Sequence, residues 1–502
     1  MMRQTLFSLL IILSLHSGAQ TYKEKFRPQV HFSPPKNWIN DPNGLLYYNG
    51  EYHLFYQYNP FGNTWGHMSW GHAVSRDLVH WKNLPVAIPE DKHNMIFSGS
   101  AVVDKENTTG FAGKTGKTPL VAIYSAHIIP DTSKRNDYLQ NQHIAYSLDN
   151  GRTWTKYKGN PVLDLNKKDF RDPKVFWHEP TKKWVMAVVF PHEHIVQLYG
   201  SPNLKEWTHL SDFGPEGDIK DIWECSDLLE VPIKGNAGKK KWVLINSQQT
   251  TMQYFVGEFD GTNFKNENPK DRIYRPDYGP DNYAAITYNN LPATHFPIIV
   301  GWANNWTYGQ SIPTKPWRSA MTLPRTLQLE KRDGEWILLQ QPIAALGKLR
   351  YEPYQASNLR ISGGKSIPVK TQLAEIDLSI QPIDATDAGI RIMVGGNKSM
   401  TIGYYKESGN LYIDRSNSGN ISFHPEFSKW LRTEVPVKIK DKLRLRIFID
   451  KSLVEVYVND GEVVLTAQVF PEPTQTGIEL FSNGEKSMVN SIKVWKLRSV
   501  WE

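Results

Sequence analysis

A polar turn that ends in tryptophan recurs along the first half of this chain, and this repeat constrains the fold more than any other feature. The copies lie at 75–81 (SRDLVHW), 147–154 (SLDNGRTW) and 201–207 (SPNLKEW), each after a run of β-forming residues, with a weaker copy at 257–264. Helical periodicity is almost absent from Leu45 to about Leu329. Strand pairs repeated at intervals of roughly fifty to seventy residues are typical of a β-propeller, and we expect about five blades.

Acidic residues stand at matching places in these repeated units. Asp41, Asp172 and Glu224 each come just before the first strand of an antiparallel pair. Ser98 occupies the same place in a fourth unit. The sequence DPNG at 41–44 predicts a tight turn at the mouth of a hairpin. Because the first strand of each blade lines the central channel of a propeller, we expect these side chains to converge at one end of that channel.

The sequence changes character after about Tyr351. Tryptophan becomes sparse, and alternating apolar and polar residues predict a series of strands, with a strong hairpin signal at 459–461 (NDG). This pattern is typical of a β-sandwich. We therefore expect an all-β chain with a five-bladed β-propeller at 24–340, a linker at 341–354 and a C-terminal β-sandwich at 355–502.

Residues 1–19 have the pattern of a secretory signal peptide. Arg3 precedes the apolar run 6–15, and small residues follow at 17–19. The run is too short to span a bilayer, and no later stretch is apolar and long enough to do so. We therefore expect an exported protein, periplasmic or extracellular, without membrane insertion. Cys225 is the only cysteine, so no intramolecular disulfide can form.

The charge of the chain is basic but dispersed. The formal net charge is +7, yet the lysines are scattered through turns such as 167–168 and 239–241. We interpret them as a solvated surface and expect no nucleic-acid partner. These patterns leave the oligomeric state open.

Three carboxylates that meet in a channel indicate either a hard-cation site or glycoside hydrolysis. A calcium loop places its oxygen ligands close together in sequence, and none of the three segments has that spacing. His192 and His194 form one alternating pair, which is a weak metal signal. We expect no metal and no cofactor. Glycoside hydrolysis needs one carboxylate that attacks or activates water and one acid of raised pKa that protonates the leaving oxygen.

The neighbours of the acids suggest how these roles are divided. Arg171 is expected to keep the adjacent Asp172 ionised. Glu224 lies between a tryptophan and a cysteine, an apolar setting that favours a raised pKa. We therefore expect Glu224 to be the acid/base, with either Asp41 or Asp172 as the nucleophile.

Seven stretches carry a resemblance that no single one would establish. They are 37–44 (NWINDPNG), 55–60 (FYQYNP), 65–67 (WGH), 97–100 (FSGS), 170–173 (FRDP), 223–227 (WECSD) and 316–321 (PWRSAM). Together they resemble the glycoside hydrolases of family 32, which include invertases, inulinases and levanases. The match runs from about Arg27 to the C-terminus, and 449–457 (IDKSLVEVY) is similar to the sandwich of that family. The resemblance implies a five-bladed propeller with a β-sandwich that cleaves fructosyl linkages with retention and without a metal.

The resemblance also implies roles for individual residues. Asp41 would be the nucleophile, Glu224 the acid/base, and Asp172 the residue that grips the hydroxyls of the fructosyl ring. The motif positions expected to line the fructose pocket are Asn40, Gln57, Trp65, Phe97, Ser98 and Arg171. Trp302 or Trp306 is expected to form the wall of the pocket. Asp277 and Asp281 flank the next acidic position of the family, and both are candidates for substrate binding.

The chain departs from the family pattern at two places. Ser226 stands where many relatives have proline, which changes only a turn. The segment 246–252 is shorter and less glycine-rich than in exo-acting fructanases. We expect this segment to border the mouth of the pocket, where it bears on the length of substrate that is accepted.

The sequence thus predicts an exported β-fructosidase that removes terminal fructose from levan, inulin or sucrose. The alternative is an endo-acting levanase that releases fructo-oligosaccharides, and a fructosyltransferase would differ only in the acceptor. A fructan-binding propeller without catalysis would lack a carboxylate, whereas all three are present. An arabinan- or xylan-cleaving propeller enzyme would share the acids, but it would not be expected to carry both 38–44 and 97–100.

Overall fold

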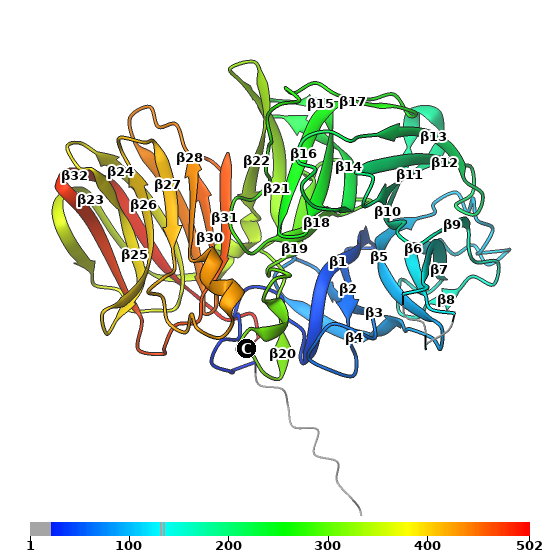
Figure 1. Ribbon diagram of the computed structural model, residues 1–502, viewed down its shortest axis with the longest axis horizontal. Helices are drawn as coiled ribbons and strands as arrows, with labels where there is room; N and C mark the ends of the chain where they lie inside the picture. The colour runs from blue at the N-terminus through cyan, green and yellow to red at the C-terminus, as the bar shows by residue number, and fades with distance from the viewer. Residues whose placement is uncertain (1–21, 131–132, 134–135, 502) are drawn as a thin grey trace, which may run out of the picture.

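The computed structural model describes residues 22–130, 133 and 136–501, so the signal peptide expected at 1–19 lies outside the described residues. Two β-rich domains stand side by side in Figure 1, with residues 37–342 on the right and 350–497 on the left. Helical structure in the described part of the chain is limited to short 3-10 turns. These are η1 (Glu179–Thr181), η2 (Gly309–Ser311), η3 (Ala344–Leu349) and η4 (Pro425–Trp430).

The first domain is a propeller built from antiparallel units whose consecutive strands pair with one another. The first unit contains β1 (Asn37–Tyr48), β2 (Glu51–Tyr58), β3 (Ser69–Ser75) and β4 (Trp81–Ile88). The second contains β5 (Asn94–Val103), β6 (Leu120–Ile128), β7 (Leu139–Ser147), β8 (Thr155–Lys156) and β9 (Leu163–Lys167). The third contains β10 (Arg171–His178), β11 (Lys183–Phe190), β12 (Ile195–Ser201) and β13 (Thr208–Phe213).

The remaining strands of this domain form one eight-stranded sheet. Its first part contains β14 (Trp223–Ile233), β15 (Asn236–Gln248), β16 (Thr251–Phe259) and β17 (Phe264–Asn266). Its second part contains β18 (Tyr283–Thr287), β19 (Ile298–Trp302), β21 (Arg325–Arg332) and β22 (Glu335–Pro342). The strand pairing between the two parts is limited to one position, Ile233 with Leu329, an arrangement consistent with five units. The short strand β20 (Trp317–Arg318) pairs in parallel with β1 and so ties the end of the domain to its beginning.

The innermost strand of every unit is irregular near its start. Register shifts fall between Ile39 and Pro42 in β1, Ile96 and Gly99 in β5, Arg171 and Lys174 in β10, Glu224 and Asp227 in β14, and Tyr283 and Ile286 in β18. A β-bulge bends a strand and re-aims its side chains, and it tolerates a proline that cannot donate to the ladder. Asp41 therefore lies within a bulged strand, and the turn expected at 41–44 is not formed.

The second domain contains a β-sandwich. Its strands are β23 (Arg350–Ile367), β24 (Leu373–Pro382), β25 (Asp387–Gly395), β26 (Lys398–Tyr405), β27 (Asn410–Asp414), β28 (Arg432–Pro436), β29 (Leu443–Asp450), β30 (Leu453–Val458), β31 (Val463–Gln468) and β32 (Gly477–Leu497). The long strand β32 pairs with β25 in its first half and with β24 in its second half. It thereby joins the strands that enclose a core of buried Ile, Val and Leu side chains.

The connection between the domains is shorter than the linker expected at 341–354. Strand β22 extends to Pro342, η3 follows, and β23 begins at Arg350. Arg350 and Tyr351 already pair with β32, so the backbone hydrogen bonds of the sandwich hold the residues that the sequence placed in a linker.

Buried charges join the two domains. Asp450 and Glu455, from the β29–β30 hairpin, both contact the ring of His31, at 2.7 Å from Nδ1 and 3.2 Å from Nε2. Arg325 of the propeller donates from Nη2 to Glu455 Oε2 at 2.9 Å. Breaking a buried ion pair leaves an uncompensated charge, so this network resists separation of the domains. Burial alone would lower the pKa of His31, but its hydrogen bonds to Asp450 and Glu455 raise the pKa to about 9.

The raised pKa of His31 predicts a loss of stability at alkaline pH. The charged ring contributes in full below its unfolded pKa of about 6.5, and this contribution disappears as the pH rises through about 9. The difference corresponds to roughly 3 kcal/mol. We expect the free energy of unfolding, measured in urea, to fall between pH 6.5 and 9.5, and to fall less in His31→Gln. An equal fall of the free energy of unfolding with pH in the two proteins would contradict a charged His31 in the folded state.

Candidate active site

Asp41, Asp172 and Glu224 meet at the bulged end of the inner strands. Asp41 on β1 and Asp172 on β10 are buried, at 8% and 6% exposure. The Sγ atom of Cys225 lies 3.6 Å from Asp41 Oδ2 and 3.7 Å from Asp172 Oδ2. Glu224 precedes Cys225 on β14. The predicted convergence of three acids from three units is therefore confirmed.

Asp41 is held by the neighbours that the sequence placed beside it. Ser98 Oγ donates to Asp41 Oδ2 at 2.6 Å, and Asn40 Nδ2 donates to Oδ1 at 3.0 Å. The amide of Asn40 is itself fixed, because its Oδ1 accepts from Trp38 Nε1 at 2.7 Å. Burial raises the pKa of Asp41, although the hydrogen bonds from Ser98 and Asn40 oppose that effect. Hydrogen bonds to both oxygens fix the orientation of the carboxyl group.

Asp172 is aimed into the site by an unusual backbone conformation. Its φ is +65°, in the left-handed region, and its backbone N–H donates to Ser125 Oγ at 2.9 Å. The backbone N–H of Cys225 donates to its Oδ2 at 2.9 Å. Burial raises the pKa of Asp172 to about 7; the Arg171 charge opposes this and the Glu224 and Asp41 charges add to it. Arg171 therefore favours the ionised form of Asp172, as expected, but burial outweighs its effect on the pKa.

Arg171 pairs with Glu224 instead. Its Nε and Nη2 lie 3.1 and 3.0 Å from Glu224 Oε1, and its Nη1 donates to Asp169 Oδ1 at 2.7 Å. The Tyr283 hydroxyl donates to the other oxygen of Glu224. Glu224 thus has a polar, charged setting rather than the expected apolar one, because residues distant in sequence surround it. Tyr283 was not among the expected site residues, although it begins the bulged inner strand β18, and the acids likewise lie near the starts of theirs.

Aromatic side chains surround the acids. Trp65 is 39% exposed, and its ring stands edge-on to half-buried Phe97 at 6.1 Å between centroids. Half-buried Trp306 lies 4.7 Å from the ring of fully buried Trp302 and 6.5 Å from the ring of Tyr283. Trp306 therefore has the exposed surface that a pocket wall needs, whereas Trp302 supports it from behind. Gln57 is buried and donates from Nε2 to the carbonyl of Ile96 at 3.0 Å, which links the first two units.

Asp277 and Asp281 lie at the interface between the domains. Asp277 Oδ2 accepts from Arg325 Nη1 at 2.9 Å and from the Thr466 hydroxyl at 2.7 Å. Asp281 accepts from Arg415 Nη1 at 2.5 Å and from the backbone N–H of Gln468 at 2.7 Å. The structure brings neither carboxylate into contact with the three acids, and it gives both a role in joining the propeller to the sandwich.

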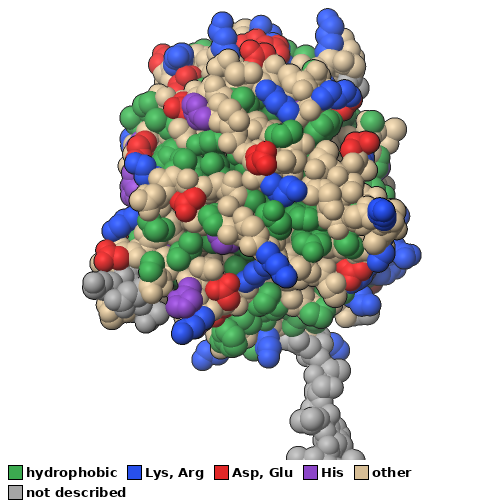
Figure 2. All heavy atoms as spheres, turned by 90° about the vertical axis from the view of Figure 1, so that its right-hand side faces the viewer, with side chains coloured by type: hydrophobic (Ala, Val, Ile, Leu, Met, Phe, Trp, Pro, Cys, Tyr) green, Lys and Arg blue, Asp and Glu red, His purple; other side chains and the backbone are tan. Residues whose placement is uncertain are grey.

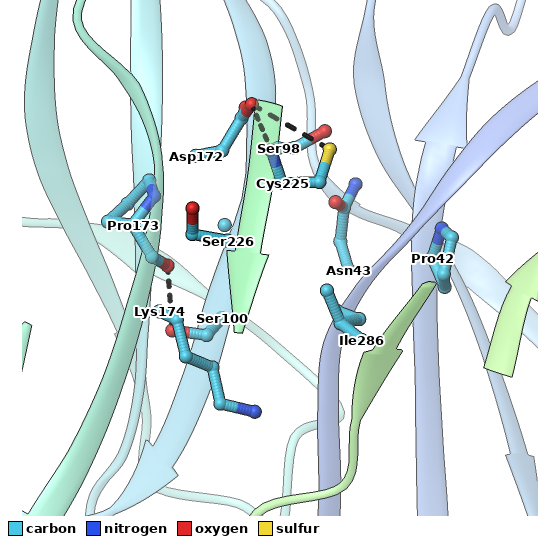
Figure 3. A pocket seen from close by; sticks show the side chains of 11 residues that line it. Pro42, Asn43, Ser98, Ser100, Asp172, Pro173, Lys174, Cys225, Ser226 and Ile286 are labelled. Atoms are coloured by element: carbon cyan, nitrogen blue, oxygen red, sulfur yellow. Dashed lines mark hydrogen bonds between the residues drawn. The ribbon is translucent and has the colours of Figure 1, made fainter. Parts of the chain in front are cut away.

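The channel is closed below the acids. Ser98, Asp172 and Cys225 border a space of only about 10 Å³, and Lys174 stands beneath them in Figure 3. Lys174 Nζ lies 3.1 Å from Asp227 Oδ1 and donates to the Thr287 carbonyl at 2.9 Å. A substrate that enters from the bulged end of the channel therefore meets a floor.

The expected loop at 246–252 is a tight hairpin. Asn246 pairs with Gln253, and Gln248 with Thr251, which leaves only residues 249 and 250 in the turn. Ser226, the other departure from the family pattern, donates from Oγ to Asn246 Oδ1 at 2.7 Å. This contact fixes the base of the hairpin against β14.

Features of other functional classes are weak in the described residues. No group of three or more His, Cys, Asp or Glu side chains there could hold a metal ion, and no described helix is long and apolar enough to cross a bilayer. Figure 2 shows one face on which the Lys and Arg side chains of the described residues are interspersed with acidic and hydrophobic ones.

Comparison with known sequences identifies the family. The profile of the glycosyl hydrolases family 32 N-terminal domain matches residues 31–342, and the family 32 C-terminal profile matches residues 345–496. The chain belongs to glycoside hydrolase family 32. It is therefore an enzyme, a glycoside hydrolase with the propeller and sandwich fold of that family.

Named relatives of this family 32 chain cover nearly all of it. A levanase from Bacillus subtilis is 44% identical over 99% of this chain and 74% of its own length. An extracellular exo-inulinase from Aspergillus awamori is 39% identical over 96% of both chains. The crystal structure of exo-inulinase from Aspergillus awamori superposes with a TM-score of 0.89, at 38% identity over 96% of this chain and 100% of the other.

Proposed function

We propose that this protein is an exported, exo-acting β-fructosidase that removes terminal fructosyl units from fructans and sucrose with retention of configuration. The observation that carries the proposal is the meeting of Asp41, Asp172 and Glu224 above a closed floor. The similarity to a levanase and an exo-inulinase supports fructans as substrates. The signal pattern at 1–19 supports export.

In the proposed reaction, Asp41 attacks the anomeric carbon of the fructosyl ring. Glu224 gives its proton to the glycosidic oxygen as that bond breaks, and a fructosyl ester on Asp41 remains. Glu224 then takes a proton from water, whose oxygen displaces Asp41 and releases fructose. Ser98 and Asn40 orient the attacking carboxyl group, and Arg171 and Tyr283 orient Glu224.

Asp172 is proposed to bind hydroxyls of the fructosyl ring. Its raised pKa of about 7 lets the carboxyl group both donate and accept hydrogen bonds near neutral pH. It lies close to Asp41, since both contact the same thiol, so it can grip the ring that Asp41 attacks.

The closed floor favours an exo mode. Asp41 and Asp172 are at most 8% exposed, so the reacting unit must descend to reach them. The end of a chain can do this, whereas an internal unit carries chain on both sides. An endo-acting levanase would require the acids to lie in an open cleft.

Early reaction products test this proposal. The mature protein is incubated separately with levan, inulin and sucrose, and the products of the first minutes are separated by chromatography. We expect fructose from all three, with glucose from sucrose and with the relative rates reporting the linkage preference. A ladder of fructo-oligosaccharides from levan would replace the exo mode by the endo mode, and products longer than the substrate would indicate fructosyl transfer.

A further inference from the structure

A second and larger cavity opens at the opposite end of the propeller channel. Its volume is about 460 Å³, and its lining includes Val103 at the end of β5, Trp177 near the end of β10, and Asn290 after β18. Trp177 lies five residues beyond Asp172 on the same strand. At about 3.3 Å per residue, this places the cavity roughly 16 Å from the acids.

The two cavities are separated by buried and partly buried polar contacts. The floor formed by Lys174 and Asp227 lies beneath the acids. Closer to the second cavity, Asn289 Nδ2 donates across the channel to the carbonyls of Ala101 and Val175, at 2.8 and 2.9 Å. A ligand of the second cavity must therefore enter from the opposite face, and the hydrolytic mechanism does not use this space.

Aromatic rings form the wall of this cavity and are fixed by their neighbours. Trp177 is half-buried, packs edge-to-face on Trp184 at 5.1 Å, and donates from Nε1 to Glu179 Oε2 at 2.7 Å. Trp184 Nε1 donates to the Thr108 hydroxyl at 2.9 Å. Because protein atoms satisfy both indole N–H groups, the half-buried ring of Trp177 offers apolar surface to a ligand, and the buried ring of Trp184 supports it.

The polar groups of the cavity suit a neutral ligand. The exposed side chains at its rim carry both signs of charge, and Glu179 and Lys182 neutralise each other in an ion pair. Lys105, Glu106 and Asn290 add further donors and acceptors to the lining. A sugar combines apolar C–H faces with many hydroxyls, and the volume falls within the range of about 300–1,000 Å³ usual for ligand pockets.

We propose that this cavity binds a short oligofructosyl segment of the polymeric substrate and so tethers the enzyme to fructan. The inference rests on the proposed function, because that function makes fructan the polymer that the enzyme meets. A second attachment point raises the effective concentration of chain near the catalytic pocket without new contacts there. This second attachment affects only long substrates, since sucrose cannot reach both sites.

The test compares a polymer with a short substrate. In the inactive Asp41→Asn background, electrophoresis in gels containing levan measures affinity for the polymer. We expect Trp177→Ala to raise the apparent Kd for levan by about tenfold. In the active protein, the same substitution should raise KM for levan while kcat on levan and kcat/KM on sucrose stay within about twofold of wild type.

Two further variants control for folding and for general adhesion. Glu106→Trp changes an exposed residue of the lining and fills the cavity, so it should weaken levan binding without disturbing the fold. Phe296→Ala removes an aromatic side chain that is 39% exposed and lies outside the cavity lining, and it should bind levan as wild type does.

The possible outcomes distinguish this inference from the proposed function. Suppose that the wild-type protein turns over fructan normally and that levan affinity is unchanged in both Trp177→Ala and Glu106→Trp. This result would overturn the second site and leave the proposed function standing. Absence of fructan turnover in the wild-type protein would overturn both. Weaker levan binding in both cavity variants, with unchanged sucrose hydrolysis, supports the tether.

Discussion

Asp41→Asn should abolish turnover while the protein stays folded. The amide cannot attack the anomeric carbon, so we expect kcat on sucrose to fall by at least about 10⁴-fold, or roughly 5 kcal/mol of transition-state stabilisation. The amide oxygen can still accept the hydrogen bond from Ser98 that the carboxylate accepts at 2.6 Å. Initial rates with sucrose measure the loss, and urea denaturation checks the fold.

The repeat supplies a matched control for this substitution. Asp149 occupies the turn at 147–154, and Asn203 stands at the corresponding place in the turn at 201–207. Asp149→Asn therefore removes a carboxylate outside the site and replaces it with a residue that the same turn accepts elsewhere. It should retain near-normal activity. Near-normal activity in Asp41→Asn as well would remove Asp41 from the role of nucleophile.

Glu224→Gln should lose activity in a way that depends on the leaving group. On sucrose, whose leaving oxygen needs a proton, we expect kcat to fall by about 10³-fold. On a β-fructoside with an acidic phenol as leaving group, formation of the fructosyl ester needs no proton donor. The rate of that step should therefore fall by about tenfold or less. The burst of phenol in the first turnover separates this step from the later attack of water.

A carboxylate on the same strand provides the comparison for Glu224. Glu230 lies further along β14, is exposed and pairs with Lys240 at 2.9 Å. Glu230→Gln should leave the activity on both substrates unchanged. Equal losses on sucrose and on the phenyl fructoside in Glu224→Gln would argue against proton donation and for a purely structural part in holding Arg171 and Tyr283.

The repeat made the fold and the acid cluster predictable. Because each acid lies near the start of an inner strand, knowing the propeller was enough to bring Asp41, Asp172 and Glu224 together. The partner of Arg171 was not predictable, because sequence adjacency favoured Asp172 while the bulge in β10 turns the guanidinium towards Glu224 on the next unit. The positions of Asp277 and Asp281 were not predictable for the same reason, since their partners Thr466, Gln468 and Arg415 belong to the other domain.

Tyr283 illustrates what a search for charges leaves out. It begins the fifth inner strand and contacts Glu224, but a tyrosine in an apolar run is indistinguishable in sequence from a core residue. The bulge that aims it is a property of strand pairing, which only the structure displays.

The parallel pairing of β1 with β20 bears on when the enzyme becomes active. Residues 37 and 38, just before the proposed nucleophile, pair with Trp317 and Arg318 near the end of the domain. A chain that emerges from its N-terminus cannot form this pair until almost the whole propeller has been delivered. If the proposed export and catalytic roles hold, a chain that has not yet delivered Trp317 and Arg318 would carry the three acids without the closed ring that positions them, and we expect it to be inactive.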